Sequence, residues 1–257
     1  SSLIESQTYP LCADVDELAT MWWMDGGTET ILQIPVTSKD ELPAQNGVRY
    51  LPYQDGAVPD YIPTAEVVNL FEDGDARLDI YFVMDKLTTT SGASGYAVEF
   101  NKFPDESGLW EALNKDQSAR FTSEPKVFRI GEMYLIAVEA YAKMGDLASA
   151  TKYLNLLKAS RFYDYTETQF PSADAIFKEL KNERRRELLG EGFRIFDLKR
   201  LGDDMGRGEV QNSAFCLFPG SAVTTNMKKS ASDPMFVWPI PQAERDANPQ
   251  IVQNPGY

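Results

Sequence analysis

The spacing of apolar residues predicts two adjacent helices in the second half of the chain. Apolar and small side chains recur every three or four positions, as they do along one face of a helix. The first set is Ile130, Tyr134, Ala137, Val138, Tyr141 and Ala142, and the second is Leu147, Ala150, Leu154 and Leu157. Gly145 and Asp146 separate the sets; Gly suits the left-handed residue that ends a helix, and Asp accepts from the first amides of the next. The pattern therefore predicts a helical hairpin over residues 127–160.

The predicted hairpin has features of a tetratricopeptide repeat. Tyr141, Gly145 and Ala150 stand where such a repeat has its aromatic, turn and small packing residues. One helical pair cannot bury its own apolar face, because helical repeats are stabilised by stacked neighbours. We therefore expect a face of the hairpin that the rest of this chain covers only in part.

A third helix is predicted from Ser172 to Gly190. Ser172 is a suitable cap, and the segment carries the run Glu-Arg-Arg-Arg-Glu-Leu at 183–188. A short amphipathic stretch over 193–200 follows and is expected to end at Gly202.

The remaining segments predict short elements between long loops. We expect a helix within 11–24, a strand at 30–36 pushed to a sheet edge by Pro35, a helix at 64–71 capped by Thr64, strands at 80–83 and 98–103, a strand-like stretch after Phe236, and a short helix after Pro241. Segments 37–63 and 104–125 lack periodicity and are predicted as loops. In the acidic turn at 72–79, the ligand spacing of a calcium loop is missing, so we expect Arg77 to pair with a carboxylate there.

Length and composition allow a substantial core. The 257 residues are 43% hydrophobic, and the patterns divide them into a loop-rich, ligand-facing segment (1–125), a helical core (126–202) and an irregular segment with the tail (203–257). We expect these to form one structural unit. The net charge of -14 argues against nucleic acid or an anionic membrane as a direct partner. No apolar run approaches the about 20 residues needed to span a bilayer.

The chain contains no histidine, which narrows the possible chemistry. Ser-His-Asp and Cys-His catalysis and the commonest zinc sites are excluded. The two cysteines, Cys12 and Cys216, allow at most one disulfide and form no metal motif. Neither a metal nor an organic cofactor is expected.

Three stretches, in order, resemble the RagB/SusD family of nutrient-binding lipoproteins from Bacteroidetes-type bacteria. The first is Tyr-Ile-Pro-Thr-Ala-Glu-Val-Val-Asn-Leu-Phe at 61–71, followed by Asp75 and Arg77. The second is the helical hairpin with ERRREL-x-x-EGFR-x-FDLKRLG at 183–202. The third runs from Trp-Pro-Ile-Pro-Gln at 238–242 to Asn-Pro-Gly-Tyr at 254–257.

The resemblance implies a mainly α, SusD-like fold: a tetratricopeptide-like hairpin plus further helices, with long loops and a few short β-strands. It also implies a non-enzymatic protein at the external face of the outer membrane, held there by a lipid anchor. Such a protein binds a glycan, less often a peptide, and delivers it to a TonB-dependent, SusC-like transporter. Family members are about twice this long and carry a lipidated cysteine near the start. We therefore expect a fragment or a truncated member, with Cys12 a poor lipid acceptor because no apolar segment precedes it.

Two kinds of side chain are candidates for function. Glu183 and Glu187 lie one helical turn apart, and glycosidases use two carboxyl groups. Three arginines stand between them, however, and favour a structural lattice of ion pairs, which is also how this motif reads in the family. The alternative functions left open are a tetratricopeptide-type protein-interaction scaffold and a carboxylate-dependent glycoside hydrolase.

Aromatic residues in loops are the better candidates for a glycan site, because flat rings stack on the C–H faces of sugars. The aromatics in or beside irregular segments are Trp22, Trp23, Tyr50, Tyr53, Tyr61, Tyr96 and Trp110. From these we select Trp22, Tyr50, Tyr53 and Trp110 as ligand-binding residues. At most one ring of the adjacent Trp22 and Trp23 can readily face a core. The aromatics expected in the core instead are Tyr141, Tyr153 and Trp238.

Overall fold

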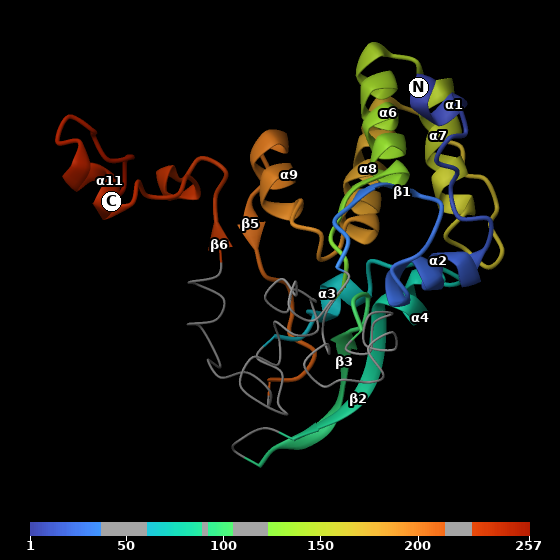
Figure 1. Cartoon of the computed structure of the whole chain (residues 1–257), viewed down its shortest axis with the longest axis horizontal. Helices are drawn as coiled ribbons and strands as arrows, with labels where there is room; N and C mark the ends of the chain where they lie inside the picture. Colours follow the sequence, from blue (N-terminus) through green and yellow to red (C-terminus); the bar gives the residue numbers. More distant parts are fainter. Residues whose placement is uncertain (37–60, 89–91, 105–122, 214–227) are drawn as a thin grey trace.

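The computed structural model describes residues 1–36, 61–88, 92–104, 123–213 and 228–257 (Figure 1). In chain order, the elements are α1 (Ser2–Glu5), α2 (Val15–Trp23), β1 (Thr30–Gln33), α3 (Ala65–Val68), α4 (Arg77–Tyr81), β2 (Phe82–Thr88), β3 (Ser94–Phe100), β4 (Lys126–Arg129), α6 (Ile130–Met144), α7 (Leu147–Ala159), α8 (Ala173–Glu187), α9 (Arg194–Leu201), β5 (Met205–Gly206), β6 (Lys228–Lys229), a 3-10 turn (Pro234–Phe236) and α11 (Gln242–Ala247). The strands form three antiparallel pairs, β1–β4, β2–β3 and β5–β6. The predicted class, mainly α with a few short strands, is confirmed.

The predicted hairpin is confirmed as α6 and α7. Gly145 ends α6 in the left-handed conformation, with φ at 82°. The Asp146 carboxylate then accepts from the backbone amide of Ser149 at 3.0 Å and caps α7. At α8, the Ser172 hydroxyl accepts from the amide of Ala175 in the same way. Local capping therefore sets the end of α6 and the starts of α7 and α8 as predicted. At the other end of the predicted hairpin, residues 127–129 belong to strand β4, and α6 begins only at Ile130 without a side-chain cap.

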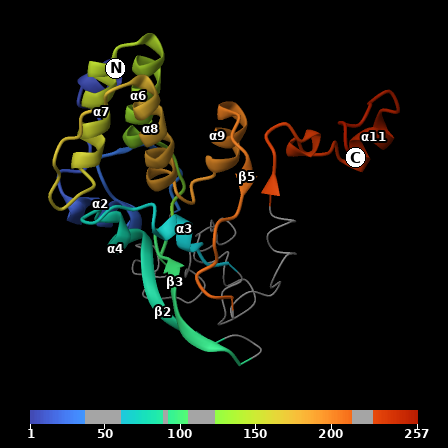
Figure 2. The same ribbon diagram turned by 180° about the vertical axis from the view of Figure 1, so that it is seen from behind.

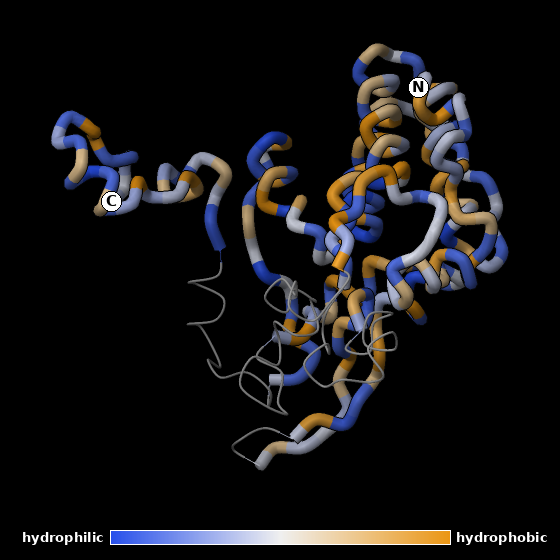
Figure 3. The backbone as a smooth tube through the Cα atoms, viewed as in Figure 1, coloured by the Kyte–Doolittle hydropathy of each residue, from blue (hydrophilic) through white to orange (hydrophobic). Residues whose placement is uncertain are grey.

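The three long helices pack together around one apolar cluster, which we call the helical core (Figures 1 and 2). Its fully buried members, besides Ile4 from α1, include Ile130, Leu135, Val138, Leu154, Leu157, Ile176 and Leu180. Apolar positions lie mainly where these helices face one another (Figure 3). The hairpin is covered only in part by the described residues, because Ile136 and Leu156 remain 47% and 43% exposed.

A second cluster, the aromatic core, lies where α2 and α4 meet the base of the β2–β3 hairpin. Its buried members include Cys12, Leu18, Met21, Trp22, Phe71, Ile80, Tyr81 and Phe82. Trp22 makes edge-to-face contacts with Tyr81 and Phe103 at centroid distances of 5.9 and 5.3 Å. These contacts join α2 to α4 and to the segment that follows β3.

The prediction of a strand at 80–83 is wrong for the first half of that segment. Ile80 and Tyr81 complete α4, since the amide of Ile80 donates to the carbonyl of Ala76, and the extended backbone begins only at Phe82. The returning strand is β3, which pairs with β2 from Phe82–Phe100 to Thr88–Ser94. The Thr64 cap is confirmed by its bond from Val67, but α3 is shorter than predicted.

The tail differs from the sequence prediction at two points. Phe236 lies in the 3-10 turn and no strand follows it before α11 in the described tail. Trp238, predicted as a core residue, is 79% exposed. The tail is held by polar contacts to its backbone instead: the Asn254 amide donates to the Trp238 carbonyl, and the Tyr257 hydroxyl donates to that of Val237. In both ribbon views the tail extends beyond α9, away from the helical core.

Candidate functional site

Glu187, at the end of α8, is buried completely and receives hydrogen bonds from three guanidinium groups. Arg161 donates to both of its carboxylate oxygens at 2.9 Å. Arg129 donates to Oε1 at 2.9 Å and Arg77 donates to Oε2 at 3.1 Å. Arg77 also donates to Oε1 of Glu183, one turn earlier on α8, at 2.6 Å. Arg77 therefore bonds to the carboxylates of both glutamates and links them.

Each of the three arginines also binds a carboxylate other than that of Glu187. Arg77 binds Asp75 through two bonds of 2.9 and 2.7 Å, and Arg161 binds Glu29 through two bonds of 2.8 Å. Arg129 binds Glu191 at 2.8 and 2.7 Å. We call the whole set the arginine–glutamate cluster: Glu29, Asp75, Arg77, Lys102, Arg129, Arg161, Glu183, Arg186, Glu187 and Glu191.

The cluster joins the two cores of the molecule. Arg77 and Arg129 lie over aromatic-core rings, Phe71 at 5.7 Å and Trp22 at 4.8 Å. Lys102 lies 4.1 Å from the Trp22 ring centroid and donates to the carbonyls of Glu187 and Leu189, where α8 has no helical partners left. One end of α8 is thus tied to four other segments, which lie before α4, after β3, before α6 and after α7.

Several residues of this arrangement escaped sequence reasoning: Glu29, Lys102, Arg129 and Arg161, which lie outside the predicted third helix, and Gly131. A Cβ added to Gly131, in the first turn of α6, would lie 2.7 Å from Oε1 of Glu187. Only glycine leaves room for the carboxylate to approach the helix so closely. The signal available in the sequence was a glycine inside the predicted helix, next to Arg129 and Ile130.

The surroundings keep these carboxyl groups ionised. Burial acts to raise the pKa of Glu183, but the Arg77 and Arg186 guanidinium groups outweigh it and hold the pKa at about 2. The pKa of Glu187 is likewise well below its ordinary value, since Arg161, Arg129 and Arg77 more than offset its burial. A general acid needs a proton, and a nucleophile needs a free, accessible oxygen. The predicted structural lattice is therefore confirmed for both glutamates.

The structure separates the four predicted ligand-binding residues. Trp22 is fully buried among Tyr81, Phe103 and Lys102, so its ring has no exposed face for a sugar. Trp23 is half-buried. The other three choices, Tyr50, Tyr53 and Trp110, lie outside the described residues, and their role stays a prediction.

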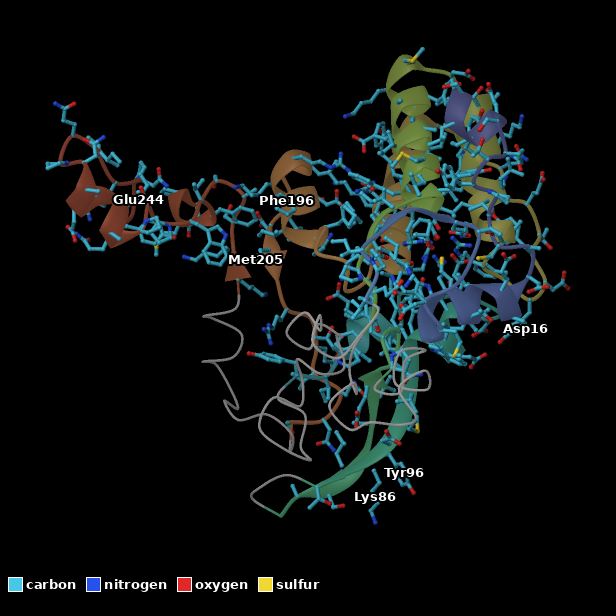
Figure 4. The ribbon with its side chains drawn as sticks, in the orientation of Figure 1. Asp16, Lys86, Tyr96, Phe196, Met205 and Glu244 are labelled. Carbon is cyan, nitrogen blue, oxygen red and sulfur yellow. The ribbon has the colours of Figure 1, made fainter. Side chains whose placement is uncertain are left out.

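Two of the other loop aromatics singled out from the sequence, Tyr61 and Tyr96, are open to solvent. Tyr96 on β3 is 70% exposed and pairs across the hairpin with Lys86; in Figure 4 both side chains lie near its outer end. Tyr61, before α3, is 55% exposed. Gln211 ties the two segments together, because its amide donates to the carbonyls of Pro63 and Val98 and accepts from the Val98 amide. The described structure thus presents two exposed tyrosines on adjoining segments.

Among the described residues, no group of acidic or cysteine side chains is placed to hold a metal ion. Cys12 is buried, and burial together with the nearby Glu29 carboxylate raises the pKa of its thiol.

Within the described part of the chain, no helix has the length and apolar character to cross a membrane.

Comparison with known proteins agrees with this fold. Residues 34–257 match the model of the SusD family. A SusD-like protein from Formosa agariphila is 35% identical over 164 residues, which are 60% of this chain and 29% of that protein. Among solved structures, a SusD superfamily protein from Bacteroides thetaiotaomicron is 24% identical and matches 98% of this chain and 54% of its own with a TM-score of 0.76. The surface glycan-binding protein A from Bacteroides uniformis, 22% identical, matches 98% and 54% with a TM-score of 0.64. This chain spans about half the length of these solved structures.

We predict that Glu187→Gln destabilises the protein by about 3–5 kcal/mol, because it leaves three buried guanidinium groups short of an anionic partner. Urea denaturation followed by circular dichroism measures the change. Glu66→Gln is the control, since Glu66 is 49% exposed and pairs at the surface with Arg185, and it should change stability by less than about 1 kcal/mol. Equal, small effects of the two substitutions would contradict the structural role of Glu187.

The second prediction concerns the stability of the folded protein at low pH. The pKa of Glu183 falls from its ordinary 4.5 to about 2 in the folded protein, and the pKa values of Glu187 and Glu191 fall as well. Their stabilising contribution is therefore complete above pH 4.5 and is lost as the pH drops towards 2. Free energies of unfolding measured from pH 6 to pH 2.5 should decrease steadily below pH 4.5. A constant value across that range would refute the assignment.

Proposed function

Because the chain belongs to the SusD family, we propose that it binds a glycan at the cell surface without chemically altering it. The observation that carries the proposal is the family match over residues 34–257, which includes the arginine–glutamate cluster beyond Glu29 and the whole tail. The name of the Bacteroides uniformis structure, a surface glycan-binding protein, supports the same ligand class. Identity to that structure is low, so the family match is the stronger support.

The geometry is compatible with binding by aromatic rings. The long helices and the arginine–glutamate cluster form a packed, ion-paired base, while Tyr61 and Tyr96 stand exposed on adjoining segments. An exposed phenol ring can stack on a sugar face and offers a hydroxyl group to its polar edge. We propose Tyr61 and Tyr96 as ligand contacts and keep Tyr50, Tyr53 and Trp110 as candidates. Trp22 is withdrawn, because its ring is buried.

We also propose the partner and location that the family resemblance implies. The glycan would pass to a TonB-dependent, SusC-like transporter in the outer membrane, with the protein held at the external face by a lipid anchor. The net charge of -14 suits a protein that does not rest directly on an anionic lipid surface.

The two alternative functions have less support. A glycoside hydrolase would need an accessible pair of carboxyl groups, and Glu183 and Glu187 are buried and occupied by arginines. A tetratricopeptide-type scaffold would explain α6 and α7. It would give no reason for exposed tyrosines beside the β2–β3 hairpin or for the SusD-type tail.

The test is affinity electrophoresis of the protein through gels that contain different polysaccharides. We predict retention by at least one polysaccharide, weakened several-fold by Tyr61→Ala or Tyr96→Ala, because a stacked ring contributes on the order of 1 kcal/mol. Phe196→Ala is the matched control: this α9 ring is 68% exposed, close to the 70% of Tyr96, and should not affect retention. The variants of Tyr50, Tyr53 and Trp110 belong in the same series.

Retention that is unchanged in all five variants would remove these aromatics from the binding site. If no polysaccharide retards the parent protein, while a protein other than a SusC-like transporter binds it, the scaffold alternative replaces the glycan proposal.

A further inference from the structure

A groove lies on the outer side of α7, away from the tyrosines just described. It runs between this helix and the connection from α7 to α8, with a volume of about 460 Å³. Its lining residues are Leu147, Ala148, Thr151, Lys152, Asn155, Leu156, Glu167, Gln169 and Phe170. Sites for small ligands typically measure about 300–1,000 Å³, so the groove has the size of a binding site.

The walls of the groove are fixed by buried contacts. Asn155 on α7 is buried, and its amide group donates to the carbonyl of Thr168 at 3.0 Å. Its side-chain oxygen accepts from the Thr168 amide at 3.1 Å and from the Tyr165 hydroxyl at 2.6 Å. Phe170 packs against the helical core at the far end of the same wall. The connection is therefore held along α7 by these contacts.

The lining has the chemistry of a site for a polyhydroxylated molecule. Leu147, Ala148, Leu156 and Phe170 provide apolar surface. Between them stand a hydroxyl, an amide, a carboxylate and an ammonium group, which together donate and accept hydrogen bonds. A sugar presents the same combination, because it has apolar C–H faces and hydroxyl groups that both donate and accept hydrogen bonds.

The charges of the groove favour an uncharged ligand. Lys152 and Glu167 contribute one charge of each sign to the lining. The chain as a whole carries a net charge of -14. An anionic polysaccharide would meet a repulsive field, whereas a neutral one would not.

We propose that the groove between α7 and the 160–172 connection is a second binding site, for a neutral oligosaccharide. The inference rests on the proposed glycan-binding function, since it assigns the same class of ligand to another part of the molecule. Two separate sites would let one long chain be held at the tyrosines and at the helical core together, which raises the overall affinity beyond that of either site.

The test is an NMR titration of the ¹⁵N-labelled full chain. Neutral tetrasaccharides of glucose, xylose and mannose are added one at a time, together with a tetrasaccharide of uronic acids for comparison. At least one neutral sugar should shift the amide signals of Thr151 and Gln169. Thr151→Val and Gln169→Ala should weaken that binding several-fold, because each removes a hydrogen-bonding group and leaves the fold intact.

A matched pair of substitutions isolates the groove. Ala148 and Ala159 are both exposed alanines of α7, but only Ala148 lines the groove. Ala148→Arg should block it and weaken binding at least ten-fold, and Ala159→Arg, with the same change of charge, should leave binding unchanged.

Three results would overturn the inference: equal effects of the two arginine substitutions, shifts caused only by the uronic acid sugar, or no shifts at Thr151 and Gln169 with any sugar. If affinity electrophoresis still shows retention that depends on Tyr61 and Tyr96, only the groove is rejected and the glycan-binding proposal stands. If a peptide rather than a sugar shifts the groove signals, the groove is a protein contact and the inference is wrong.

Discussion

The structure depends on one buried carboxylate, Glu187, and the three guanidinium groups that donate to it. Taking an ion out of water costs several kcal/mol, and a partly paired ion inside a protein is strongly unfavourable. The cluster is therefore stable only when all its contributors are in place. Because Arg77, Arg129 and Arg161 come from segments far apart in the chain, this requirement fixes α4, the β1–β4 pair and the end of the hairpin relative to α8. Gly131 belongs to the same constraint, since a side chain there would occupy the space of the carboxylate.

The same interaction decides what the two glutamates can do. In a glycosidase, one carboxyl group must hold a proton and the other must reach the sugar. Here arginines hold both groups ionised and burial closes them off, so the residues that looked most like catalytic ones form the base of the scaffold. The ligand contacts that we propose, the Tyr96 ring and the groove along α7, lie at the surface instead.

The elements governed by local rules could be predicted from the sequence. The α6–α7 hairpin follows from helical periodicity and from the turn at Gly145 and Asp146, and α8 follows from its Ser172 cap. The pairing of Arg77 with a carboxylate also followed, because a short acidic turn surrounds it. What could not be predicted depends on residues far away in the chain. Trp22 precedes an Asp-Gly-Gly turn and looked like the edge of a loop, but Tyr81, Lys102 and Phe103 bury it. The prediction for Trp238 failed in the opposite direction. A strand-like stretch suggested a core position, but the ring is exposed in the tail. The groove on α7 was missed because its second wall is an irregular connection with no periodic pattern.

We propose that this protein binds a glycan and leaves it intact. The most direct test is to incubate the purified protein for a day with a polysaccharide that retards it in affinity electrophoresis, and to measure the chain length of the polysaccharide by mass spectrometry. We expect the glycan to be recovered at its original length, with no new reducing ends above a protein-free control. Shorter products that form with the parent protein, and that disappear in a folded Glu183→Gln variant, would contradict it.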